Sequence, residues 1–220
     1  MTGTLSIVST PIGNLEDITL RAIRTLKEAD LIAAEDTRRA GVLMKTYGVV
    51  SPVTSFHAHN GKKKTRGLMK VLREGKNIAL ISDSGTPGIS DPGYILIKEC
   101  IAENVKVISI PGPTALIAAL VLSGKPASKF VFEGFLSNKS GRRKKQLEAL
   151  ASEERTVVVY ESPHRIEKMM KDMAEIAPGK EVIIAREITK KFEEIKRGTA
   201  GEHLAWFAEN RPRGEYVVVF

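Results

Sequence analysis

The sequence predicts an α/β fold of two domains, and three observations lead to this prediction. Apolar strand-like runs alternate with amphipathic helix-like segments along most of the chain, a pattern typical of sheets covered by helices. With 220 residues, the chain is long enough for two modest domains that each bury a core. Turn-forming residues at positions 124–128 interrupt the pattern near the middle. We therefore expect an N-terminal α/β domain over residues 1–123 and a C-terminal α/β domain over residues 124–220.

The expected strands differ in their pairing between the two halves. Helix-like segments separate most strands of the first half, which favours parallel pairing there. The last strands follow one another closely, so mixed pairing is expected in the second half. The expected strands are residues 4–9, 30–34, 77–81, 105–110, 129–132, 156–160, 181–185, 194–198 and 215–220.

Three helices are predicted most clearly. Residues 18–26 carry apolar side chains at helical spacing, and so does the segment around Leu147 and Leu150. The segment 113–123, PTALIAALVLS, is apolar at nearly every position. A helix that is apolar all round is normally buried, so we expect this one to be buried on most sides.

The composition is that of a globular protein, with 42% hydrophobic and 27% charged residues. The N-terminal residues lack the basic segment of a signal peptide. The single cysteine, Cys100, excludes an internal disulfide and is expected to be a core thiol in a reducing compartment. We therefore expect a cytoplasmic protein. The formal net charge of +8 is spread over both halves and fits a polyanionic partner.

Four loops rich in glycine, proline and polar residues follow the expected strands of the first half. Ligands of open α/β sheets bind at the carboxyl ends of the strands. A single loop of this kind is usually a tight turn, whereas several at one edge favour a binding site. The loops are residues 9–15, 35–38, 82–93 and 111–115.

The third loop, SDSGTPGISDPG, constrains the kind of ligand. It lacks the lysine of a phosphate-binding loop, and Pro87 and Pro92 each remove a backbone N–H donor. Asp83 and Asp91 would repel a phosphate unless a metal intervened. A carboxylate beside a stiff backbone better suits a cationic, hydroxyl-rich ligand such as S-adenosylmethionine, with a Mg²⁺-nucleotide as the alternative. Because Pro92 follows it, Asp91 is better interpreted as the N-cap of the next helix.

A series of motifs extends this interpretation from residue 4 to the end of the chain. The motifs, in chain order, are STPIGNLEDIT, AEDTR, SFHAHN, LISDSGTPGISDPG, SIPGPTA, FEGFL-NKSGRR, YESPHR and AREITKKFEE. Together they resemble the tetrapyrrole methylase superfamily, and within it the bacterial small-subunit (16S) ribosomal RNA cytidine ribose-2′-O-methyltransferases. The resemblance implies two α/β domains with an S-adenosylmethionine cleft between them. It also implies a homodimer whose substrate is a cytidine in the decoding region of 16S rRNA, within the small ribosomal subunit.

The resemblance also assigns residues to the methyl donor by position. One departure is Ser137, which stands where this branch has a proline before Asn-Lys-Ser-Gly, so we expect that loop to be slightly looser. The residues that the resemblance places around the donor are Pro11, Gly13, Asp83, Ser84, Gly85, Pro87, Ile89, Thr114 and Ala115.

Two basic runs are candidate RNA contacts. Both are expected to open helices, where a cation opposes the helix dipole at a cost of about 0.3–1 kcal/mol. An exposed helix face is the simpler explanation of a lysine-rich run, but a neighbouring phosphate would account for this placement. We favour phosphate contacts for the second run and leave the first open. The candidates are Lys62, Lys63 and Lys64 in the first run and Arg142, Arg143, Lys144 and Lys145 in the second.

Transfer of a methyl group to a ribose hydroxyl requires positioning and benefits from a base. His57 and His59 would share one side of an extended segment, and no third ligand nearby supports a metal site. Entry into a helix explains the Ser-Pro pair after Glu161 but not Glu161 itself. Our hypothesis is that Arg38 and Lys139 orient the substrate phosphate, while Glu161 or one of the two histidines accepts the proton.

Two other functions compete with RNA methylation. The same fold could methylate a tetrapyrrole or a modified protein side chain, but the basic runs and the SFHAHN and YESPHR motifs argue against this. A non-catalytic nucleotide-binding module would need phosphate-loop chemistry, which the third loop lacks.

Overall fold

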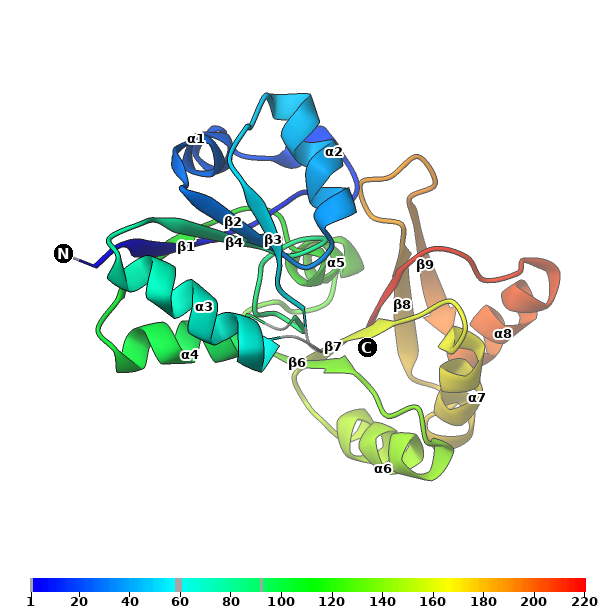
Figure 1. Cartoon of the computed structure of the whole chain (residues 1–220). Helices are drawn as coiled ribbons and strands as arrows, with labels where there is room; N and C mark the ends of the chain where they lie inside the picture. The colour runs from blue at the N-terminus through cyan, green and yellow to red at the C-terminus, as the bar shows by residue number, and fades with distance from the viewer. Residues whose placement is uncertain (1, 58–60, 92) are drawn as a thin grey trace. The chain divides into compact units, whose positions relative to one another are not determined.

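The computed structural model describes residues 2–57, 61–91 and 93–220, and the side chains of all of these except Lys62 (Figure 1). The chain forms two compact units, Met1–Thr114 and Ala115–Phe220. Both alternate strands and helices, so the expected α/β class is confirmed. None of the helices in the described ranges combines the length and apolar composition that a membrane crossing requires.

The first unit contains a five-stranded sheet with the order β3-β2-β4-β1-β5. All of its neighbouring strands are parallel, as expected. The three-residue strand β3 was not expected, because its half-buried residues lack a clear alternation. The strands are β1 (Thr4–Val8), β2 (Leu31–Ala34), β3 (Val53–Ser55), β4 (Ile78–Ile81) and β5 (Lys106–Ile110). The helices are η1 (Leu15–Asp17), α1 (Leu20–Glu28), α2 (Thr37–Tyr47), α3 (Gly61–Arg73) and α4 (Tyr94–Ala102).

Helices cover both faces of this sheet (Figure 1). One apolar cluster joins the sheet to α1 and α2, and the other joins it to α3 and α4. Cys100 lies fully buried in the second cluster, which confirms the expected core thiol. Burial, followed by the charges of Glu103 and Glu99, raises the pKa of that thiol to about 11.

The helices next to the strand-end loops begin at side-chain caps. The Oγ1 of Thr19 accepts a hydrogen bond from the Ala22 N–H at 3.0 Å, which begins α1. Asp36 Oδ1 accepts from the Arg38 N–H at 2.8 Å, which begins α2. Each cap satisfies an N–H group that has no partner within its helix. The start of α2 therefore fixes Asp36 in the short loop after β2.

The second unit contains a mixed sheet with the order β6-β7-β10-β8-β9. Only β6 and β7 pair in parallel, which confirms the expected change of pairing. The strands are β6 (Phe130–Phe135), β7 (Thr156–Glu161), β8 (Glu181–Arg186), β9 (Glu194–Thr199) and β10 (Tyr216–Val219). The helices are α5 (Ala115–Ser123), α6 (Ser140–Ala151), α7 (Ile166–Ile176) and α8 (Ala200–Glu209).

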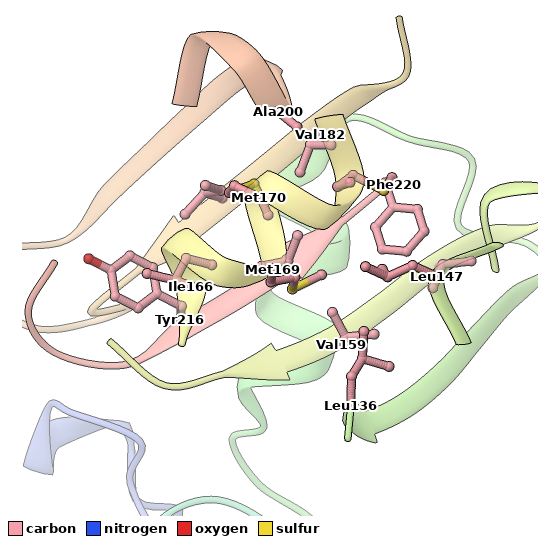
Figure 2. Close-up of a cluster of buried hydrophobic side chains, with 14 of the residues drawn as sticks. Leu136, Leu147, Val159, Ile166, Met169, Met170, Val182, Ala200, Tyr216 and Phe220 are labelled. Carbon is pink, nitrogen blue, oxygen red and sulfur yellow. The ribbon is translucent and has the colours of Figure 1, made fainter. Parts of the chain in front are cut away.

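The core of the second unit lies between this sheet and helices α6, α7 and α8. Figure 2 shows Met169 and Met170 of α7 among side chains from the strands, including Val159 and Tyr216. Alternate residues of a strand point to opposite faces of the sheet. The intervening residue Val158 is also fully buried, which is consistent with the contacts of β7 with α5.

Helix α5 differs from the expectation in two respects. Ile117 and Val121 are 44% and 70% exposed, so the prediction of burial on most sides was wrong. The cause is that only one face of α5, with Leu116 and Leu120, is buried. The expected domain boundary at residue 124 lies after α5, whereas the compact units divide before it. Helix α5 contacts β7, β8, β9 and β10, and these contacts group it with the second unit.

Candidate functional site

The loops after β1, β4 and β5 are joined at one edge of the first sheet. Thr10 and Gly85 form an isolated bridge, with N–H···O distances of 2.9 and 3.0 Å in the two directions. The hydroxyls of Ser9 and Thr86 lie 2.9 Å apart, and Thr86 Oγ1 donates to the Pro113 carbonyl at 3.4 Å. The expectation that these loops converge is therefore confirmed within the first unit.

Two glycines allow the backbones of these loops to approach closely. Gly85 has a φ of +78°, which residues with a Cβ rarely adopt. A Cβ on Gly112 would lie 2.9 Å from the Cβ of Ser9, closer than two such atoms can pack. The loops after β1, β4 and β5 thus form a compact floor that side chains at these two positions would disrupt.

Acidic side chains surround this floor. Asp83 Oδ1 accepts a hydrogen bond from the Asp36 N–H at 2.8 Å, which joins the loop after β4 to the loop after β2. Arg39 Nη1 lies 3.6 Å from Asp83 Oδ2. Glu35 Oε2 accepts from the Asp83 N–H at 3.5 Å. Burial, and then the charge of Asp83, raise the pKa of Glu35. The surroundings are therefore negatively charged and half-buried.

Asp91 belongs to this acidic group, and its expected role as a helix N-cap is wrong. The N-cap of α4 is Gly93, with no side-chain capping bond. Asp91 instead lines a small pocket with Glu35 and Ser82. Burial, and then the charge of Glu35, raise the pKa of Asp91 to about 6, against the effect of a hydrogen bond from Ser82. The Asp-Pro pair was misleading because the helix begins later than the pair suggests.

Substitution of Asp91 by asparagine is expected to stabilise the protein by about 1–2 kcal/mol at pH 8. Because the folded-state pKa of Asp91 is raised from 3.8 to about 6, the folded protein binds a proton more tightly than the unfolded chain. The wild type should therefore lose stability as the pH rises from about 4 to about 6. The full shift corresponds to about 3 kcal/mol, which partial solvent exposure reduces.

Chemical denaturation at pH 4 and pH 8 measures this effect. The stabilisation by Asp91→Asn should be small at pH 4 and larger at pH 8. Glu28→Gln, which changes an exposed acid on α1, serves as the control and should have little effect at either pH. An equal effect of Asp91→Asn at both pH values would contradict the assignment.

The residues expected at the methyl donor are brought together only in part. Pro11 and Asp83 line one pocket at this edge, and Pro87 lines the pocket that contains Asp91. Neither of these two pockets includes Gly13 or Ile89 among its described lining residues. Ser84 is half-buried and Gly85 is buried. Thr114 ends the first unit and Ala115 begins the second.

Sequence reasoning missed three residues of this edge. Arg39 lines the pocket with Pro11 and Asp83, although only its neighbour Arg38 was singled out. Ser82 lines both pockets, and Thr86 joins two loops through its hydroxyl. The available signal was their position, because all three lie within or beside the loops that follow strands.

The proposed catalytic residues of the first unit have different surroundings. His57 is half-buried, and its charge is a minor influence that lowers the pKa of Glu35, so the two lie near each other. His59 lies outside the described residues. Arg38 is 89% exposed and pairs with Asp36 at 2.7 Å. No group of three or more His, Cys, Asp or Glu within the described ranges is arranged to hold a metal ion.

Glu161 lies fully buried at the end of β7, in the second unit. Its Oε1 accepts hydrogen bonds from the Ser162 N–H and from Arg165 Nε, both at 2.7 Å. Arg165 Nη2 lies 2.6 Å from the same oxygen. These contacts fix the Glu161 side chain in the turn before α7, and its role as the base stays a prediction.

The neighbouring Tyr160 anchors the start of α5. Its hydroxyl accepts a hydrogen bond from the Leu116 N–H at 3.2 Å. Its ring makes edge contacts with Phe132 and Phe135, at centroid distances of 4.9 and 5.7 Å. Tyr160 therefore positions Ala115, the first residue of α5 and one of the residues expected at the donor.

The second basic run begins α6 as expected, but part of it is unavailable for RNA. Arg143 is buried, and its Nε donates to Asp172 Oδ2 at 2.7 Å. Lys144 pairs with Glu175 and lies 3.8 Å from Asp172. Arg143 shares the buried face of α6 with Leu147 and Leu150, so it points towards the core. The prediction that Arg143 contacts phosphate is therefore wrong, and Lys144 is largely neutralised. Lys139, Arg142 and Lys145 remain exposed.

The first basic run begins α3, also as expected. Lys64 Nζ donates to the Thr54 hydroxyl at 2.9 Å, whereas Lys63 is exposed. The side chain of Lys62 lies outside the described part of the structure.

The sequence of this chain matches a known protein family. A sequence model of the tetrapyrrole (corrin/porphyrin) methylases matches residues 4–203. The chain belongs to the tetrapyrrole methylase family. The expected family is thereby confirmed, and this methylase has its two pockets and acidic residues at the carboxyl edge of the first sheet.

Two of its relatives by sequence have the same name. The ribosomal RNA small subunit methyltransferase I of Thermotoga maritima is 49% identical, over 99% of this methylase and 97% of the relative. The protein of the same name from Escherichia coli O157:H7 is 46% identical, over 99% and 77% of the two chains.

Solved structures agree with the fold. Uroporphyrin-III-C-methyltransferase from Thermus thermophilus superposes with a TM-score of 0.70 at 20% identity, covering 99% of this methylase and 94% of that chain. Diphthine synthase gives a TM-score of 0.76 at 14% identity, covering 99% and 89%. At these identities the likeness concerns the fold alone, and it confirms the expected tetrapyrrole methylase-like architecture.

Proposed function

We propose that this methylase transfers a methyl group from S-adenosylmethionine to the 2′-hydroxyl of a cytidine ribose in the decoding region of 16S ribosomal RNA. The supporting observation is the sequence likeness to ribosomal RNA small subunit methyltransferase I proteins from several bacteria, at 45–49% identity over nearly the whole chain. The resemblance described in the sequence analysis supports the position of the methyl group, the ribose 2′-hydroxyl of a cytidine in the decoding region. The alternatives, a tetrapyrrole or protein-side-chain methylase, share only the fold at low identity.

The residues at the edge of the first sheet fit the proposed donor. When bound, S-adenosylmethionine supplies an electrophilic methyl group on a sulfonium cation. Glu35, Asp83 and Asp91 give the edge a negative character that favours a cation or hydroxyl groups over a phosphate. The bridge between Thr10 and Gly85 fixes the backbone of two loops at the same edge. These residues would hold the donor together with those that the resemblance places there.

Positioning of the hydroxyl is the main catalytic contribution that we propose for this chain. The proton is assigned to Glu161 or to one of the two histidines, His57 and His59. Lys139 is exposed at the start of α6 and is proposed to orient a substrate phosphate. Arg38 could orient a phosphate only if its ion pair with Asp36 were broken.

Labelled methyl transfer onto free 16S rRNA and onto assembled small subunits tests the proposed function. The expected product is a single 2′-O-methylcytidine in the decoding region, which nuclease digestion and mass spectrometry would locate. Methylation of a base, or label transferred only to a tetrapyrrole or a protein, would refute the proposal. Comparing the two substrates also shows whether the enzyme acts within the small subunit.

We further propose a cytoplasmic homodimer. The sequence resemblance supports the dimer, and the proposed ribosomal substrate supports the compartment. Analytical ultracentrifugation measures the assembly directly, and a species with the mass of one chain at micromolar concentration would contradict it.

A further inference from the structure

One face of α3 carries cations that have no acidic partners. This helix contains six lysine and arginine residues and no acidic residue, with the sequence GKKKTRGLMKVLR. Lys63, Arg66 and Lys70 follow the spacing i, i+3 and i+7, so they lie on the same side of the helix. All three are exposed, whereas Leu68 and Leu72 are buried in the core.

One cation of α3 outside this face is engaged by an acid. Arg73 of α3 pairs with Glu103, which ends α4, at 2.6 Å. Within the described ranges, no ion pair or hydrogen bond joins Lys63, Arg66 or Lys70 to another side chain. The three charges are therefore available to an external anion.

The tertiary structure makes the two basic runs different. In α6, Asp172 and Glu175 of α7 neutralise Arg143 and Lys144. In α3, the row of cations continues beyond the first basic run as far as Lys70. The neighbouring helix α4 does not cover this row, because Lys63, Arg66 and Lys70 are all exposed. From the sequence alone, the run in α6 is the stronger candidate for RNA binding. The structure removes Arg143 from that run and adds α3 as a second candidate.

Without a bound anion, the row of cations on α3 does not stabilise the protein. Like charges three or four residues apart destabilise a helix by about 0.2–0.5 kcal/mol per pair. Lys63 also lies near the N-terminus of α3, where a cation opposes the helix dipole. A polyanion laid along this face would compensate both effects. The row spans about 10 Å along the helix, which exceeds the spacing of neighbouring phosphates in a nucleic acid strand.

We propose that the face of α3 formed by Lys63, Arg66 and Lys70 contacts the backbone phosphates of the RNA substrate. This inference rests on the proposed function, because it takes RNA as the substrate. The face binds without reading the sequence of the RNA, since cations on phosphates position a nucleic acid but do not distinguish its bases. No aromatic residue lies on α3 to stack on a base.

The test measures the binding of a 16S rRNA fragment at several salt concentrations, without a methyl donor. The variant is Lys63→Gln, Arg66→Gln, Lys70→Gln. Each lost phosphate contact lowers the slope of log K against log salt by about 0.7–0.9, so the triple variant should lose about 2–3 in slope. A matched variant on α1, Arg21→Gln, Arg24→Gln, Lys27→Gln, removes the same charge from another exposed helix. It should change the slope by less than about 1.

The outcomes separate this inference from the proposed function. An unchanged slope in the α3 variant, or an equal loss in the α1 variant, would overturn the inference even if the wild type methylates rRNA. A loss confined to the α3 variant would support it even if the methylated position differs from the proposal. Thermal melting shows whether the triple variant is folded. If it is not, the single variant Arg66→Gln is used, with an expected slope change of about 0.7–0.9.

Discussion

Replacement of Arg143 by methionine is expected to lower the free energy of unfolding by about 3–5 kcal/mol. Arg143 and Asp172 form a buried ion pair, with side chains 5% and 7% exposed and a distance of 2.7 Å. Removal of the arginine leaves the carboxylate of Asp172 buried with only the more distant Lys144, at 3.8 Å, as a partner. An uncompensated buried charge has a cost of this size. Urea denaturation monitored by circular dichroism measures the change.

Two further variants show whether the buried pair is the cause. Lys145→Met removes an exposed cation two residues away and should leave stability nearly unchanged. The double variant Arg143→Met, Asp172→Leu removes both charges and should recover much of the loss, because an apolar pair can replace a buried ion pair. If Arg143→Met kept full stability and instead weakened RNA binding, Arg143 would be a phosphate contact after all.

Asp83→Ala is expected to weaken the binding of S-adenosylmethionine by about 10- to 100-fold. Asp83 holds the loop after β2 through the Asp36 N–H and contributes negative charge to the pocket that it lines with Pro11 and Arg39. Loss of one hydrogen bond to a charged group corresponds to about 1.5–3 kcal/mol. Isothermal titration calorimetry with the donor, or with S-adenosylhomocysteine, measures the affinity.

Asp83→Asn separates the two contributions of this side chain. Its amide oxygen can still accept from Asp36, so the loop is retained while the charge is lost. A smaller loss of affinity in Asp83→Asn than in Asp83→Ala would assign part of the effect to loop geometry. Unchanged donor affinity in both variants would show that the donor binds elsewhere.

Much of the fold could be predicted because strand and helix patterns are local. Every expected strand is present, with ends that differ by at most a few residues. The missed strand, β3, has only three residues, all half-buried, and it lies beside β2 alone. The side on which α5 packs could not be predicted, since its apolar pattern has no polar face to mark the exterior.

The candidate site could be predicted less completely. The convergence of the loops follows from parallel pairing, so glycine and proline after successive strands were a sufficient signal. Asp91 was assigned wrongly because capping depends on where a helix begins. The contact of Glu161 with Arg165, only one turn along the chain, was not predicted from the sequence.

By itself, the sequence determined the α/β class, the family and the loops that meet at one sheet edge. These depend on periodicity and on residues that are neighbours in the chain. Only the tertiary structure decided which charged side chains stay available, because an ion pair joins groups that packing brings together. Arg143 and Asp172 are 29 residues apart and neutralise each other in the core. Lys63, Arg66 and Lys70 remain exposed because α3 packs on the sheet and α4 through its other side.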